Sequence, residues 1–224
     1  MSKKKTVAVA LVLALVLIIG GMLAYFTDTD TKTNVFTLGD EVEISLSETG
    51  WTNSTGTNYT LAAAQGVHPG TTVAKDPTIN NESTTTPAYV FAEIIVPCYD
   101  ADGDNTADTP LYKLLNSSDT ALTMTQGSAG NSGWVLINAP SVDTSSDTIT
   151  YVYAYASGTA SGNMTSLAAS ASTTTPVFSK VQVDPNLTAT QASGVSDPNI
   201  TVNAYGIQTD GLSVTTPSDI YALF

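Results

Sequence analysis

The feature of this sequence that most constrains its fold is a series of short segments with the residue pattern of β-strands. In these segments apolar and polar residues alternate with a period of two, or β-branched and aromatic residues dominate, whereas helical periodicity is nearly absent after residue 24. Clusters of Gly, Pro, Asn, Asp and Ser separate the segments, as turns require. The predicted strands cover residues 42–46, 71–79, 88–96, 134–137, 149–156, 177–183 and 200–208.

Many short strands in a chain of 224 residues are typical of one all-β domain, a sandwich or a barrel, and not of a βαβ fold. Start signals at Pro217 and Ser218 predict a helical turn over residues 218–224. The polar stretches 52–60, 157–175 and 187–198 have the composition of surface loops rather than of interdomain linkers. We therefore expect a single β-sandwich domain over residues 39–224.

The charge balance excludes several classes of partner. The chain has 20 acidic residues against seven basic ones, which are all lysines, and its formal net charge is −13. Three of these lysines, Lys3, Lys4 and Lys5, lie together at the N-terminus. Because a nucleic-acid-binding face must be positive to release counterions from phosphates, no nucleic-acid partner is expected.

The single cysteine, Cys98, and the single histidine, His68, limit the metal and redox chemistry. One cysteine allows no internal disulfide, and the two together cannot supply a Cys₄ or Cys₂His₂ zinc site. Cys98 ends an apolar run and is expected to be a small core residue; the alternative is a reactive or intermolecular thiol.

Residues 1–24 have the pattern of an export signal. The lysines at 3–5 are followed by an unbroken apolar run over 7–19 and by mostly small residues over 20–24. Cleavage is predicted after Ala24 or Tyr25, which makes the rest of the chain extracellular. The alternative is an uncleaved membrane anchor, because the apolar stretch approaches the roughly 20 residues that span a bilayer.

An ordered set of short motifs resembles the TasA/camelysin family of exported bacterial proteins, which are processed by the SipW-type signal peptidase. Each motif alone is weak, but together they cover nearly the whole chain. They are GGMLAYFTD at 20–28, NVFTLGD at 34–40, PG at 69–70, KDP at 75–77, NN at 80–81, AYVF at 88–91, GW at 133–134, YVYAY at 151–155 and AYGIQTDG at 204–211.

The resemblance implies a jelly-roll-like antiparallel β-sandwich preceded by a hydrophobic signal helix. It also implies a secreted structural subunit of biofilm-matrix or cell-surface fibres. Its partners would be further copies of itself, joined head to tail, and the SipW-type signal peptidase. An anchor or minor fibre protein and matrix polysaccharide are further candidate partners.

In such fibres the N-terminal segment of one subunit adds a strand to the next. Residues 25–38 are polar and rich in threonine, so the segment cannot form a core of its own, although it could pair with an open strand edge. From the residues alone it could equally fold back as the first strand of its own sandwich or remain free; the resemblance favours donation. The apolar anchors are Tyr25, Phe26, Val35, Phe36 and Leu38.

Camelysin carries a metalloprotease label, so a protease is the first alternative function. A helical H-E-x-x-H motif needs two histidines, and His68 lies alone before Pro69 and Gly70. Aspartic proteases carry the tripeptide Asp-Thr-Gly in their active-site turns. The similar tripeptide here, Thr209-Asp210-Gly211, has the same residues in a different order and is typical of a turn. We expect no catalytic residues and no required cofactor; the second alternative is a monomeric or membrane-tethered adhesin.

An acidic loop is the remaining candidate site. Asp100, Asp102, Asp104 and Asp108 follow the strand at 88–96 with a spacing that matches four ligand positions of an EF-hand loop. Asn105 stands where glycine is preferred, and Leu111 stands where the bidentate glutamate belongs. The loop is therefore a candidate for weak calcium binding; the alternative is an acidic, solvated hairpin tip.

Overall fold

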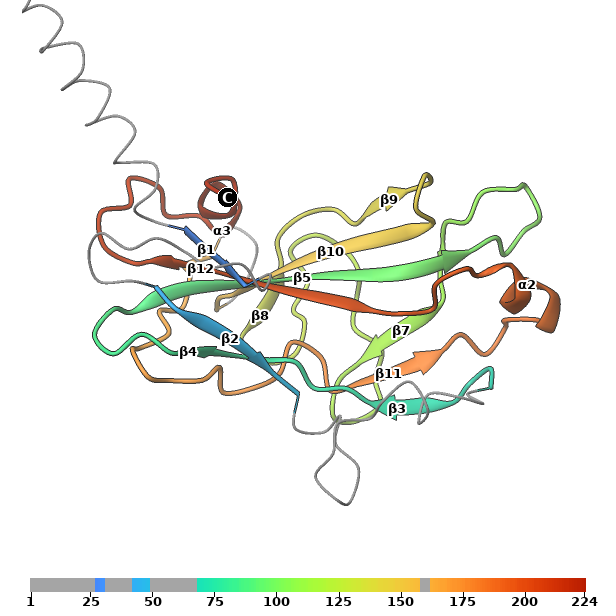
Figure 1. Cartoon of the computed structure of the whole chain (residues 1–224), viewed down its shortest axis with the longest axis horizontal. Coiled ribbons are helices and arrows are strands. Elements are labelled where there is room, and N and C mark those ends of the chain that lie inside the picture. The colour runs from blue at the N-terminus through green and yellow to red at the C-terminus, as the bar shows by residue number, and fades with distance from the viewer. Residues whose placement is uncertain (1–26, 31–41, 49–67, 158–161) are drawn as a thin grey trace, which may run out of the picture.

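The computed structural model describes residues 27–30, 42–48, 68–157 and 162–224 (Figure 1). The predicted signal peptide, residues 1–24, lies outside the described residues, as does the cleavage position at Ala24 and Tyr25. The other predicted anchors, Phe26, Val35, Phe36 and Leu38, also lie outside them. Within the described ranges, no helix is long and apolar enough to cross a membrane.

The larger sheet crosses the middle of the molecule (Figure 1). Its neighbouring strands are antiparallel, and most of them are far apart in the sequence. In spatial order they are β1 (Thr27–Asp30), β12 (Thr201–Gln208), β5 (Ala88–Tyr99), β10 (Thr148–Tyr155) and β8 (Trp134–Leu136). Two short strands extend it, β6 (Thr109–Pro110) beside β5 and β9 (Ser141–Asp143) beside β10.

Two smaller antiparallel sheets form the opposite layer, below the larger sheet in Figure 1. One has the order β3 (Thr72–Ala74), β11 (Lys180–Val183), β7 (Tyr112–Leu115). The other pairs β2 (Ile44–Ser47) with β4 (Thr78–Asn81).

The main core lies between these layers. Alternate residues of β5, such as Val90, Ile94 and Val96, point into it, as do the tyrosines of β10 and Trp134 of β8. The aromatic stripe Tyr151, Tyr153 and Tyr155 is therefore core, with each residue at most 7% exposed. Period-two alternation places these side chains on one face, and burying them is the main stabilising contribution.

The other face of the larger sheet is also covered in part. Phe91 and Ile207 contribute to a second apolar cluster, over which the short C-terminal helix α3 (Pro217–Tyr221) inserts Ile220. A third, smaller cluster around Tyr99 and Leu111 lies at the end of β5, close to the short helix α2 (Ala189–Gly194). The larger sheet is thus buried on both faces near its centre.

The predicted all-β class with antiparallel sheets is confirmed, and the helical turn at the C-terminus is present as α3. The predicted strand 71–79 was wrong in one respect: it is divided into β3 and β4, which join different sheets. Pro77 separates them, because it has no N–H to donate to a ladder. The predicted loop 187–198 contains α2, which the sequence prediction missed.

Candidate functional site

The edge of the larger sheet at β12 is the first candidate site. β12 pairs with β5 along its whole length, whereas β1 covers its other edge from Ala204 to Ile207. The register places Thr27 opposite Ile207 and Asp30 opposite Ala204. We call this stretch of β12, Ala204 to Ile207, the acceptor edge. A strand edge of this kind presents backbone N–H and C=O groups that an added strand satisfies.

The acceptor edge is held in place by β2 as well as by β5. A Cβ atom on Gly206 would lie 2.8 Å from Ile44 Cγ2 and 3.2 Å from Val42 Cγ1. Real Cβ atoms do not approach another carbon so closely, so β2 packs directly on the backbone of β12 at this point. Glycine is required here for close approach rather than for an unusual φ. β2 therefore fixes the position of the acceptor edge.

The predicted donor segment, residues 25–38, enters the described structure only through β1. There, residues 27–30 pair with β12 of the same copy, while the apolar anchors on either side lie outside the described residues. Residues 27–30 thus lie on their own sheet, and folding back onto its own sandwich is one of the alternatives that the sequence left open for the segment. Donation of this strand to another copy stays a prediction.

An aromatic cluster with a glutamate at its base lies beside the acceptor edge. Tyr205 Oη and Asn203 Nδ2 each donate to Glu93 Oε2 at 2.9 Å, and Tyr221 Oη donates to Glu93 Oε1 at 3.5 Å. Phe224 packs against Tyr205 with 5.3 Å between ring centroids. Burial and the Glu93 carboxylate raise the pKa of Tyr221 to about 12. Burial and the same carboxylate also raise the pKa of Tyr205, so both phenols stay protonated and keep donating at physiological pH.

The acidic loop brings three of the four predicted metal ligands together. One carboxylate oxygen each from Asp100, Asp102 and Asp104 lies within 4.8 Å of the others, and Asp108 is outside this group. Both oxygens of Asp100 already accept backbone hydrogen bonds, from Gly103 N at 2.7 Å and Asn105 N at 2.9 Å. The bond from Gly103 is the main reason that the pKa of Asp100 lies below its ordinary value. The loop is thus folded by its own backbone hydrogen bonds, which favour the ionised form of Asp100.

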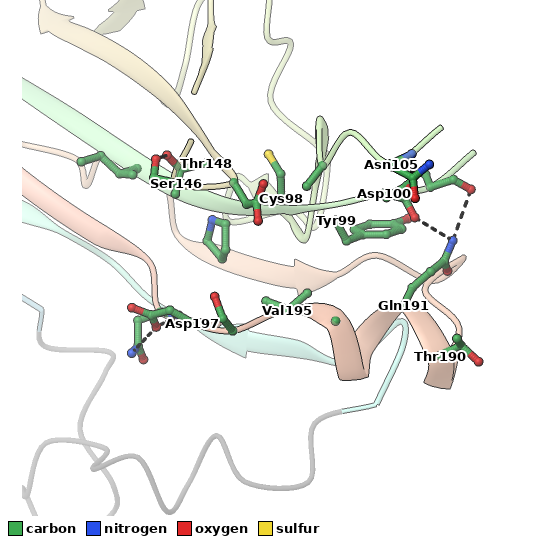
Figure 2. Close-up of a pocket in the computed structure, with 18 of the residues that line it drawn as sticks. Cys98, Tyr99, Asp100, Asn105, Ser146, Thr148, Thr190, Gln191, Val195 and Asp197 are labelled. Carbon is green, nitrogen blue, oxygen red and sulfur yellow. Dashed lines mark hydrogen bonds between the residues drawn. The ribbon is translucent and has the colours of Figure 1, made fainter. Parts of the chain in front are cut away.

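A cavity of about 780 Å³ adjoins the acidic loop (Figure 2). Its walls come from the loop, the β9–β10 turn, and the segment from α2 to the start of β12. Gln191 Nε2 donates to the backbone oxygens of Asp100 and Ala101, both at 3.2 Å, and so ties α2 to the loop. Among the described residues that line the cavity, Asp147 and Asp197 add carboxylates and none is a lysine or histidine. The cavity therefore favours cations over anions.

Calcium binding by this loop stays a prediction, and a stability measurement checks it. A ligand that binds only the folded chain adds about 1.4 kcal/mol to the free energy of unfolding at ten times its dissociation constant. We expect millimolar calcium to raise the melting temperature of the wild type but not that of Asp102→Asn. Asp210→Asn, which removes an exposed carboxylate that does not line the cavity, is the control. Equal shifts in all three chains would contradict calcium binding at the loop.

Cys98 is a core residue, not an exposed thiol: 2% of it is exposed. Burial, with the nearby carboxylates of Asp108 and Asp147, raises its pKa from 9.0 to about 11. The nucleophilic form of cysteine is the thiolate, and the raised pKa keeps Cys98 protonated in the folded chain. The alternative of a reactive thiol is therefore not favoured.

The raised pKa of Cys98 predicts a loss of stability in alkaline solution. Below pH 9 the thiol is neutral in both the folded and the unfolded chain, so its contribution is fully present. Between pH 9 and about 11 only the unfolded chain ionises at this position, and the contribution is lost. Denaturant titrations should show a smaller loss over this range for Cys98→Ala than for the wild type. Equal losses of stability in the wild type and in Cys98→Ala would contradict a raised pKa at Cys98.

Sequence reasoning missed two parts of these sites. α2 begins with a capping box in which Thr188 and Gln191 bond to each other's backbone N–H, and the T-x-x-Q pattern could have revealed it. The contacts of Glu93 with Tyr205 and Tyr221 join residues more than 100 positions apart, and no local signal predicts them. His68 is exposed in a turn, as expected.

Comparisons with known proteins place the chain in a family. Among curated proteins no match is found. A model of the camelysin metallo-endopeptidase family matches residues 1–112, which is half of the 224-residue chain. The matched part includes β1, the β2–β4 pair and β5 with the acidic loop. This match agrees with the resemblance of the motifs, and the chain belongs to the camelysin family.

Proposed function

We propose that this protein is a secreted structural subunit of extracellular fibres, in a biofilm matrix or on the cell surface. Subunits join when the N-terminal segment of one copy, freed by signal-peptide cleavage, pairs with the acceptor edge of the next. A SipW-type signal peptidase would make the cut. An anchor or minor fibre protein and matrix polysaccharide remain candidate partners.

The observation that supports this proposal is the pairing of β1 with β12. Among the described residues β1 covers four positions, lies at the edge of the sheet and pairs with no strand other than β12. A strand from a second copy can make the same backbone hydrogen bonds in the same register. Moving the strand from its own copy to the next therefore conserves these hydrogen bonds. Because head-to-tail contacts between successive copies do not close, they generate a filament.

Cleavage of the signal would act as the switch for assembly. Before cleavage the segment is joined to residues 1–24, whose apolar run holds it at the membrane. After cleavage the end of the segment is free to leave its own β12 and to reach another copy. The backbone hydrogen bonds gained between copies equal those lost within one copy. Removal of the tether and the local concentration of copies therefore decide whether the subunits assemble.

Electron microscopy of two purified chains tests the proposal. The chain beginning at Tyr25 should form filaments, whereas a chain beginning at Leu38, which lacks β1, should remain in the supernatant after centrifugation. Circular dichroism of the shorter chain shows whether it retains its β-structure. Filaments from both chains would refute assembly through this segment.

A camelysin-type surface metalloprotease is the second candidate function, because the matching family model carries the name metallo-endopeptidase. The residues of this chain do not favour it. Within the described residues, the group of side chains that could hold a metal ion consists of three aspartates, and His68 is exposed in a turn. Casein cleavage by the purified chain that a chelator abolishes would support the protease instead.

A monomeric or membrane-tethered adhesin is a further alternative. The apolar run of the N-terminus is nearly long enough to span a bilayer, and an uncleaved chain would stay attached through it. Mass spectrometry of the cell-surface and secreted fractions distinguishes the two cases. A fibre subunit should begin at or next to Tyr25, whereas a tethered adhesin would retain residues 1–24.

A further inference from the structure

Two tyrosines from distant parts of the chain are in contact on the face of the larger sheet that α3 covers. Tyr205 lies within β12, and Tyr221 is the last residue of α3. Their rings meet edge to face with 5.7 Å between centroids, a separation at which aromatic rings are in direct contact. Within the described ranges, no other ring contact joins two tyrosines. We call Tyr205 and Tyr221 the tyrosine pair.

The contact between the two rings is held by the packing of α3. Ile220, the residue before Tyr221, is fully buried in the second apolar cluster. Ser218 Oγ donates to Ile137 O at 3.2 Å, and the Tyr221 ring also lies 5.4 Å from that of Phe91 in β5. Figure 1 shows α3 beside the strands of the larger sheet. The fold therefore keeps the two rings together, although 15 residues separate them in the chain.

The hydroxyls of the tyrosine pair share one proton acceptor, the carboxylate of Glu93. Tyr205 Oη donates to its Oε2 at 2.9 Å, and Tyr221 Oη donates to its Oε1 at 3.5 Å. The ion pairs between described residues involve other carboxylates, so no lysine there neutralises Glu93. A phenol that loses an electron becomes strongly acidic, and a carboxylate at hydrogen-bond distance can take its proton at that moment.

The depth of the tyrosine pair favours coupling within one chain. Both rings are half-buried, and Phe224 packs against them with centroid distances of 5.3 and 5.9 Å. Phe224 itself is 39% exposed, so the cluster reaches the surface. An oxidant at the surface can therefore take electrons from the pair, whereas half-burial hinders either ring from meeting a tyrosine of another copy.

We propose that the tyrosine pair is a site of oxidative coupling, at which an oxidant of the peroxidase class joins the two rings as dityrosine. Each phenol gives one electron to the oxidant and its proton to Glu93, which passes it to water. The two radicals form a carbon–carbon bond between ring positions next to the hydroxyls, and the hydrogens of these carbons move to the oxygens. The two electrons and two protons released reduce one hydrogen peroxide to two water molecules.

The new bond would tie the C-terminal helix to the strand that carries the acceptor edge. It forms within a single copy, so it does not depend on fibre assembly. A covalent link between β12 and α3 restricts the unfolded chain, as a disulfide does. Oxidation outside the cell would thus fix the C-terminus onto the sheet.

Mass spectrometry of the chain beginning at Tyr25, treated with a haem peroxidase and hydrogen peroxide, tests the coupling. A protease that cuts before aspartate separates the two tyrosines, because Asp210 and Asp219 lie between them. The coupled chain should instead yield residues 197–209 joined to 219–224, with two hydrogen atoms fewer than the separate fragments. The joined fragment should come from chains that migrate as monomers. Its absence there, or its presence solely in multimers, would overturn the proposal.

Four variants assign the roles within the site. Tyr205→Phe and Tyr221→Phe should each abolish the joined fragment. Tyr112→Phe is the matched control, because this half-buried tyrosine donates to Pro198 O at 2.9 Å in another cluster, and the yield should stay unchanged. Glu93→Gln keeps an oxygen acceptor but cannot hold the proton, so the initial rate should fall by about tenfold or more.

Circular dichroism checks that each of these variants is folded. A joined fragment that persists in a folded Tyr221→Phe chain would overturn the assignment of the pair. A wild-type rate in Glu93→Gln would overturn the role of Glu93 as the proton acceptor.

Discussion

Replacing Gly206 by valine is expected to abolish filament formation and to lower the free energy of unfolding by about 1–3 kcal/mol. The new Cβ would lie 2.8 Å from Ile44 Cγ2. That carbon is attached to the Cβ of a β-branched residue that is 4% exposed, so it cannot turn away without moving β2. Either β2 or the acceptor edge must therefore shift, and the strand register opposite Asp28 is lost.

The control for this variant is Gly194→Ala in α2, where an added Cβ would meet no atom within 4 Å. It should leave filaments and stability close to those of the wild type. Sedimentation measures assembly, and urea titration measures the free energy of unfolding. If Gly206→Val formed filaments at the wild-type threshold, the close approach of β2 would have no part in shaping the acceptor edge.

Replacing Trp134 by alanine is expected to lower the free energy of unfolding by about 3–5 kcal/mol. The side chain is 1% exposed and fills the core between β8 and the opposite layer. Its Nε1 donates to Thr175 O at 3.0 Å, and its ring lies 5.3 Å from that of Tyr155. Truncation leaves a large cavity, an unpaired carbonyl and an unsupported tyrosine.

Trp134→Phe separates these contributions, because it keeps most of the ring volume and loses the hydrogen bond. Its loss of stability should be clearly smaller than that of Trp134→Ala. Val142→Ala, at an exposed position of β9, should change stability little. Urea titration of the three variants is the measurement. A loss below about 1 kcal/mol for Trp134→Ala would mean that the core does not depend on this ring.

The strands of this fold could be predicted well where the pattern is local. Alternation in residues 149–156 predicted β10, and the run after Pro87 predicted β5. The acidic loop was also predictable as a cluster, because Asp100, Asp102 and Asp104 are brought together by hydrogen bonds within a few residues. Turn geometry of this kind depends only on neighbouring residues.

The spatial order of the strands could not be predicted in the same way. β12, β5 and β10 are adjacent in the sheet, although about 50 to 100 residues separate them in the chain. Period two determines which residues face the core, but not which strand lies alongside. The packing of α3 over Phe91 and Ile207 has the same origin. Such tertiary contacts override local preference.

The most direct test of the account is a cryo-electron microscopy map of filaments grown from the chain beginning at Tyr25. In such a map the segment that joins residue 30 to residue 42 shows which copy supplies each strand. Strand donation predicts that residues 27–30 pair with Ala204 to Ile207 of the adjacent copy. A map in which every copy keeps these residues on its own β12 would contradict it.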